Sequence, residues 1–240
     1  MRPQFALVLN PRADKSDGMA LAADRFPREY RPLDTLPATT SGLAVVIAGA
    51  LTIFAYTLGP QSSHMALHIA TMNVAAPFLA AALAPRLASA IGHPRILWAA
   101  SAAQIVLLWA WHVPSLQQAA MASHGLQIVM QATLLISALV FWTAIIVIPE
   151  KKRWQAIAAL LITGKLACLL SALMIFSPRV LYQTAGHAGL HLDDQQLAGL
   201  LMITACPLSY LVAAVVIAAR MIGRIGEAPK PLSATRRVTS

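Results

Sequence analysis

The sequence predicts an all-α fold, a polytopic integral membrane bundle of six transmembrane helices. Hydrophobic residues fill 58% of the 240 positions and charged residues only 11%, whereas a soluble domain carries about a quarter charged residues. The apolar residues occur in runs of roughly 20, the length that a helix needs to cross the hydrocarbon core. The mean hydropathy of +0.66 agrees with this class.

The six predicted spans are separated by glycine and proline turn signals. A turn is expected at Pro85, and a loop is expected over 114–125. Pro77 falls inside the second span and predicts a kink near Asn73, because proline removes a backbone donor. The predicted spans are Gly42–Gly59, Met65–Ala84, Ile96–Val113, Leu126–Ile148, Trp154–Ser177 and Leu197–Arg220.

The two ends of the chain are polar. Residues 1–40 contain five prolines and lack the basic, apolar, small-residue order of a cleavable signal peptide. We therefore expect a polar cytoplasmic N-terminal segment at 1–40, a six-helix transmembrane domain at 41–222 and a disordered cytoplasmic tail at 223–240.

Lysine and arginine alternate between the two sides of this topology. The seven connections and ends carry 6, 0, 2, 0, 3, 1 and 5 basic residues in chain order. Basic residues mark cytoplasmic connections, so both termini are predicted to lie in the cytoplasm. The net charge of +9 is distributed as this topology requires, and we expect the bilayer, not nucleic acid, as the partner.

Histidines gather on the opposite, outer side. Within SSHMALHIATM, His64, His68 and Met72 recur every four residues and so share one helical face. Imidazole with thioether suits copper, particularly Cu(I), better than magnesium or calcium. The alternative is that helix-end histidines turn their polar edges to water. The predicted outer histidines are His64, His68, His112, His124, His187 and His191, while His93 lies on the cytoplasmic side.

Lys165 lies near the middle of the fifth predicted span. A lone ammonium at that depth is costly, so it is expected to be neutral, paired or beside a water-filled crevice. Asn73, Gln104, a cofactor carboxylate or a second protein could be its partner. Cys168 and Cys206 lie at comparable depth and are read first as small apolar side chains, with a metal role as the alternative.

Four stretches together resemble a known family. They are HMALHIATMNVAAP from His64, Trp111-His112-Val113-Pro114, Phe141-Trp142 and DQQLAGLLM from Asp194. In this order they are similar to the multi-pass CtaG-type cytochrome c oxidase assembly proteins, over about 42–220. The resemblance implies a respiratory-chain assembly factor in the inner membrane of a bacterium, not an enzyme, with cytochrome c oxidase subunits as partners. We expect metal contacts from His64, His68, Met72 and His112, and cofactor contacts from Lys165 and Asp194.

Other functions remain open at this point. A membrane cytochrome would use histidines on facing helices as axial haem b ligands, and His68 with His112 could serve only near the outer surface. An oxidase-associated subunit and a small-solute transporter with Lys165 on its path are further alternatives. The sequence contains no phosphate-binding glycine loop, nucleophile elbow, H-E-x-x-H or C-x-x-C motif.

Overall fold

The computed structural model describes residues 58–182 and 192–226, all within one unit of the chain, Leu36–Ser240. Every regular element in these two ranges is helical, so the all-α prediction is confirmed. The predicted segment 1–40, residues 42–57 of the first predicted span, His187, His191 and the tail after 226 lie outside the described residues.

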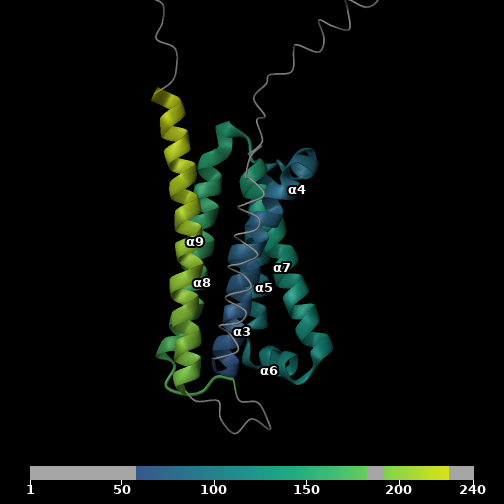
Figure 1. The fold of residues 1–240 in the computed structure, drawn as a ribbon, viewed down its shortest axis with the longest axis vertical. Coiled ribbons are helices and arrows are strands. Elements are labelled where there is room, and N and C mark those ends of the chain that lie inside the picture. Colours follow the sequence, from purple (N-terminus) through teal and green to yellow (C-terminus); the bar gives the residue numbers. More distant parts are fainter. Residues whose placement is uncertain (1–57, 183–191, 227–240) are drawn as a thin grey trace, which may run out of the picture. The chain divides into compact units, whose positions relative to one another are not determined.

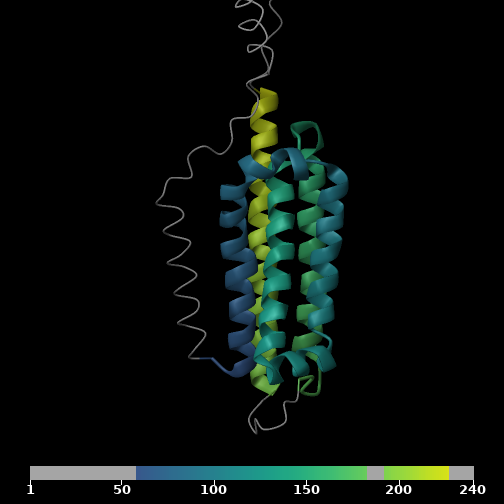
Figure 2. The ribbon, with the colours of Figure 1, turned by 90° about the vertical axis from the view of Figure 1, so that its right-hand side faces the viewer.

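The described helices pack in a closed ring. Helix α3 packs on α9, α9 on α8, α8 on α5, α5 on α7, and α7 on α4, which continues α3 (Figures 1 and 2). The elements are α3 (Pro60–Ile69), the π-helical η1 (Ala70–Ala75), α4 (Ala76–Ile91), α5 (Pro94–Trp111), α6 (Pro114–Ala122), α7 (His124–Val147), the 3-10 turn η2 (Glu150–Lys152), α8 (Arg153–Phe176) and α9 (Leu192–Gly226).

Several of these helices can cross a membrane. Four are long and apolar enough, and α5 with α6 would give a fifth, bent by 74° between the two helices. The polytopic membrane bundle is therefore confirmed, while the count of six stays a prediction because the first span lies outside the described residues. The four are Pro60–Ile91, His124–Val147, Glu150–Phe176 and Leu192–Arg224.

Three predicted connections differ from the structure. Helix α4 continues through Pro85 to Ile91, because membrane helices tolerate an internal proline when other groups satisfy the freed backbone carbonyl. The expected 114–125 loop contains α6, whose first residue is Pro114, a position where the missing N–H costs nothing. Asp193 and Asp194 belong to the first turn of α9, where negative charge favours a helix N-terminus.

The predicted kink near Asn73 takes the form of the π-helical segment η1. The N–H of Ala76 donates to the carbonyl of Thr71, five residues back. The same pattern would pair the Met72 carbonyl with Pro77, which has no N–H. Trp142 of α7 supplies the missing donor, because its Nε1 lies 3.0 Å from the Met72 oxygen. One indole therefore satisfies the carbonyl that the proline leaves without a partner.

Helices α8 and α9 approach each other closely at small residues. A Cβ on Gly199 would lie 2.7 Å from Cγ1 of Ile175 and 3.0 Å from the carbonyl oxygen of Ser171. A Cβ on Gly164 would lie 3.3 Å from the Tyr210 ring. Small residues are typical of helix contacts in membranes, where close backbone approach maximises packing. These glycines allow α9 to bring its inner face to the centre of the ring.

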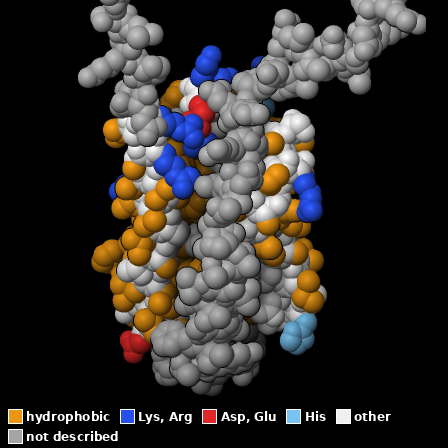
Figure 3. Space-filling view, turned by 45° about the horizontal axis from the view of Figure 1, so that its top comes forward, with side chains coloured by type: hydrophobic (Ala, Val, Ile, Leu, Met, Phe, Trp, Pro, Cys, Tyr) orange, Lys and Arg blue, Asp and Glu red, His pale blue; other side chains and the backbone are white. Residues whose placement is uncertain are grey.

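Most of the described basic side chains lie at one end of the bundle, the end where α9 finishes (Figure 3). Glu150 forms salt bridges there with Arg153 at 2.8 Å and with Arg224 at 2.5 Å. His93 starts α5 at this end, whereas Arg179 follows α8 at the opposite end, near the start of α9. The described part of the chain thus reproduces the charge asymmetry that the topology prediction used.

We expect Trp142→Phe to lower the free energy of unfolding by about 1–3 kcal/mol, because it leaves the buried Met72 carbonyl without a donor. Trp98→Phe is the matched control, since the indole of Trp98 bonds Gln155 at 3.2 Å on the exposed surface. Unfolding of the purified protein in mixed micelles measures both. Equal stability of the two variants would contradict the role given to Trp142.

Candidate functional site

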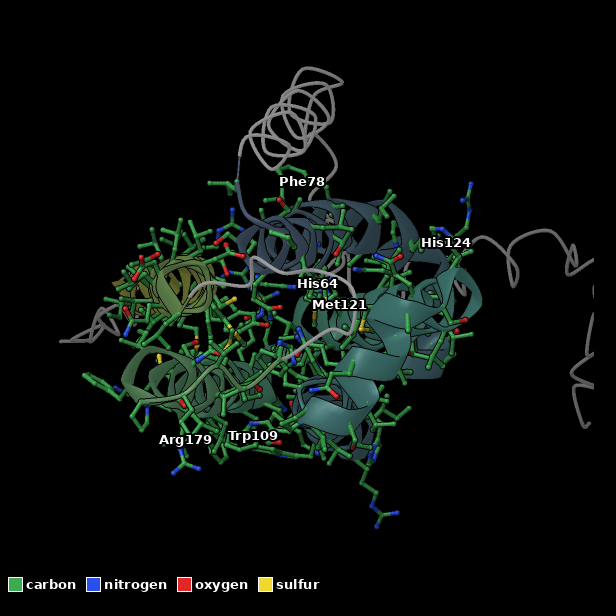
Figure 4. All side chains as sticks on the ribbon, turned by 90° about the horizontal axis from the view of Figure 1, so that it is seen from below. His64, Phe78, Trp109, Met121, His124 and Arg179 are labelled. Carbon is green, nitrogen blue, oxygen red and sulfur yellow. The ribbon has the colours of Figure 1, made fainter. Side chains whose placement is uncertain are left out.

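Three histidines from two helices meet inside the ring. Nε2 of His64 and Nε2 of His68, one turn apart on α3, lie 2.9 Å from each other. The His112 ring, at the end of α5, has its centroid 5.9 Å from that of His68. All three are at least nine-tenths buried, with exposed fractions of 7%, 5% and 5%. Seen from this end, His64 lies inside the ring, while His124 and Arg179 lie at its edge (Figure 4).

The hydrogen bonds fix the proton on one ring. Nδ1 of His112 lies 2.6 Å from the carbonyl oxygen of Leu108, so it must donate and Nε2 keeps its lone pair in the neutral ring. This Nε2 has no hydrogen-bond partner among the residues that the structure describes. Nδ1 of His68 and the side-chain amide of Gln131 are likewise buried and make no hydrogen bond within the described part of the chain. The cluster thus contains nitrogens that are buried and available to a ligand.

A small cavity adjoins the cluster. Its volume of about 20 Å³ is enough for one water molecule or one ion. Of the three residues predicted to share one helical face, His68 and Met72 line the cavity, whereas His64 does not. The lining residues are Met65, His68, Ile69, Met72, Asn73, Leu108, His112, Ala167, Met202, Cys206 and Tyr210.

The donor set fits a soft ion better than haem. Two nitrogens bound to one tetrahedral metal at about 2.0 Å would lie roughly 3.3 Å apart, close to the 2.9 Å between His64 and His68. As they stand, no three His, Cys, Asp or Glu side chains among the described residues could hold a metal ion together, so a thioether would complete the His64–His68 pair, and His112 could join it only after a shift of its ring. A cofactor pocket measures about 300 Å³ or more, and the cavity at His68 and His112 is far smaller.

Asp194 positions the helix that carries the histidine pair. The first N–H groups of a helix have no partner within it. In α3 the N–H groups of Gln61 and Ser62 donate to the Asp194 carboxylate at 2.8 and 3.1 Å, and the Ser62 hydroxyl donates to it at 2.5 Å. A Cβ on Gly59 would fall within 2.5 Å of this carboxylate. Asp194 is thus an N-terminal cap supplied by another helix, and its expected cofactor contact stays a prediction.

The two residues after Asp194 satisfy the end of a second helix. The Gln195 amide donates to the carbonyls of Met174, at 3.1 Å, and Arg179, at 3.3 Å, and its oxygen accepts from Leu181 N–H at 2.6 Å. The Gln196 amide donates to the Ile175 carbonyl at 3.3 Å. The Asp-Gln-Gln element therefore connects α9 to the start of α3 and to the end of α8.

Tyr182 is hydrogen-bonded to the end of α5, where His112 lies. Its hydroxyl donates to the backbone carbonyl of His112 at 3.1 Å. Burial raises the pKa of Tyr182 to about 12, so the phenol keeps its proton at neutral pH and remains a donor. Sequence reasoning missed this residue, because it lies in a connection without a recognisable motif. It also missed Gln131, Tyr210 and the capping role of Gln195.

Lys165 lies away from the cavity. It is exposed on the outward side of α8 and makes no salt bridge with any residue that the structure describes. Large apolar side chains share this side of the helix, as expected for contact with lipid. Its cofactor role stays a prediction, and the cavity offers it no contact. The apolar neighbours are Leu161, Ile162, Leu169, Leu173 and Phe176.

The fold and site define a multi-pass membrane protein with a buried histidine cluster at one end. The chain belongs to the Caa3_CtaG family, the cytochrome c oxidase caa3 assembly factors, whose match covers residues 38–224. This confirms the resemblance found in the sequence and agrees with a non-catalytic role. No curated protein and no solved structure matches the chain.

We expect Asp194→Ala to speed hydrogen exchange at Gln61 and Ser62 and to lower stability by about 0.5–2 kcal/mol, the usual cost of losing an N-cap. Asp193→Ala is the control, because Asp193 is exposed in the same turn. Exchange mass spectrometry of the purified protein makes the comparison. The capping role would be refuted by unchanged exchange in Asp194→Ala.

Proposed function

We propose that this assembly factor handles Cu(I) for a haem-copper oxidase at the site formed by His64, His68, Met72 and His112. The observation that carries the proposal is the buried His64–His68 pair, whose Nε2 atoms lie 2.9 Å apart. Beside it are a cavity of ion size and the free Nε2 of His112.

The energetics of burial support a ligand role. A buried polar atom without a partner costs about 1–3 kcal/mol, and Nε2 of His112 is such an atom. Such a free-energy cost is expected at an atom that binds a ligand reversibly. Imidazole and thioether are soft donors, and soft donors select Cu(I) over hard cations. The ion is cargo in this proposal, because the function of the family is assembly of another protein.

The proposed orientation places the histidine cluster at the periplasmic face of a bacterial inner membrane, where oxidase subunits would dock. The basic end of the bundle, with Arg153 and Arg224, would then be cytoplasmic, as the positive-inside rule requires. Reporter fusions after Arg224 are expected to read cytoplasmic, and fusions in 114–125 periplasmic. A periplasmic reading after Arg224 would reverse the orientation and remove the proposed face from the periplasm.

The central test uses His68, which lies between His64 and the cavity. In cells that carry only His68→Ala we expect normal levels of the protein in the membrane and at least about a tenfold loss of oxidase activity, with partial recovery on added copper. Loss of one ligand from a site with few ligands weakens binding strongly, since even outer partners of metal ligands contribute about 10–100-fold.

His124→Ala is the matched control, because His124 lies at the same end but is exposed at the edge of the ring. It should leave oxidase activity unchanged. Loss in His68→Ala that copper does not restore would favour subunit docking by the same surface over copper supply. Wild-type oxidase activity in the His64/His68 double alanine variant would refute the site.

A further inference from the structure

The cavity is lined by four sulfur-bearing side chains as well as by histidines. Met65 and Met72 reach it from α3 and η1, and Met202 and Cys206 reach it from α9. Met65, Met72 and Met202 are 1%, 4% and 3% exposed, and Cys206 is 9% exposed. Thioethers and a thiol around one small space are soft donors, the same preference that the histidines have.

We infer that Cys206, with Met202, forms a deeper Cu(I) subsite that shares Met72 and the one-ion cavity with the histidine site, so that one ion occupies one subsite or the other. This inference rests on the proposed copper function and adds its inner ligands. A second observation supports a ligand here. His112 lines the same cavity, and its buried Nε2 has no hydrogen-bond partner in the described ranges.

The depth of the subsite follows from helix geometry. Asp194 in the first turn of α9 accepts a hydrogen bond from the N–H of Gln61 in the first turn of α3, so the two helices start at the same level. Cys206 lies 12 residues after Asp194, and Asn73 lies 12 residues after Gln61, so both should lie at the same depth. The hydrogen bond between the Asn73 and Cys206 side chains agrees with this. At about 1.5 Å per residue, this level is roughly 8 Å deeper than His68. The two subsites thus lie at successive levels of one cavity that has room for a single ion.

Charge makes Cys206 the decisive ligand. A monovalent cation inside a membrane protein needs a compensating charge, and none of the described residues that line the cavity is Asp, Glu, Lys or Arg. Cys206 and Tyr210 are the lining groups that can become anions, and a thiol ionises more readily than a phenol. The Cys206 thiolate would therefore neutralise the ion.

Asn73 is placed to support the thiolate. Its Nδ2 donates to the Cys206 sulfur at 3.2 Å. Its Oδ1 accepts from the Ser209 hydroxyl at 3.1 Å, which fixes the orientation of the amide. Hydrogen bonds to a ligand sulfur orient it and tune its affinity. An ordinary buried apolar cysteine would not need a donor held in this way.

The binding step is balanced in charge and atoms. The S–H bond of Cys206 breaks as the Cu(I)–S bond forms, and no electron is transferred. One proton leaves to the aqueous phase for each ion bound, because metal ligands must be deprotonated. The site is neutral before and after binding, apart from the charge on the departing proton. Proton release therefore distinguishes the thiolate from the neutral histidines.

The test compares the purified full-length protein with Cys206→Ser and Cys168→Ser, loaded anaerobically with Cu(I) alone. Cys168 is the matched control, because it is the other cysteine in a span and does not line the cavity. We expect sulfur and nitrogen ligands in the copper X-ray absorption spectrum of wild type and release of a proton when the ion binds at Cys206. Cys206→Ser should lose that proton and bind at least about tenfold more weakly, while Cys168→Ser should match wild type.

Cys206→Ala, checked for the same helix content and elution, is the second variant in case the serine disturbs folding. Copper bound through nitrogen only, or undiminished proton release in Cys206→Ser and Cys206→Ala, would overturn the subsite while the histidine site stands. Wild-type protein that binds no Cu(I) would overturn both this inference and the proposed copper function. Binding lost in the His64/His68 double variant but kept in Cys206→Ser would leave the histidine site alone.

Discussion

The geometry of the site depends on one requirement, that each backbone carbonyl within the bilayer find a donor inside the protein. Pro77 prevents α3 from meeting this requirement by itself. The backbone forms one π-helical turn there, and the Met72 carbonyl accepts a hydrogen bond from the indole of Trp142 in α7. The same turn places Asn73 against α9. One proline thereby ties the histidine-bearing helix to two neighbours at the inner end of the cavity.

The outer end of the site is fixed by the same rule, applied to helix termini. The first N–H groups of α3 and the last carbonyls of α8 would face the membrane interface without partners. Asp194, Gln195 and Gln196 satisfy them from the first turn of α9. Polar residues that look like ligand contacts in a sequence here serve the main chain. His68 and His112, by contrast, each keep a buried ring nitrogen without a hydrogen-bond partner among the described residues.

The sequence predicted the helices well, because spans are long apolar runs and their ends carry Pro, Gly or charge. It also placed His64 and His68 together, since residues four apart must share a helical face. It could not predict Tyr182 on the His112 carbonyl or Asp194 on Gln61, because these contacts join residues 70 and 133 positions apart. The cavity was equally hidden, since it arises from packing of α3, α5, α8 and α9 and no segment signals it.

The cap on α3 also means that the start of this helix is completed late in synthesis of the chain. The donors at Gln61 and Ser62 emerge from the ribosome 133 and 132 residues before their acceptor, Asp194. At about 5–20 residues per second, they wait for roughly 7–27 s. During that time the start of α3 depends on water or lipid headgroups at the interface. The histidine pair can therefore reach its final geometry only after the last helix enters the membrane, so a truncated chain would lack a finished site.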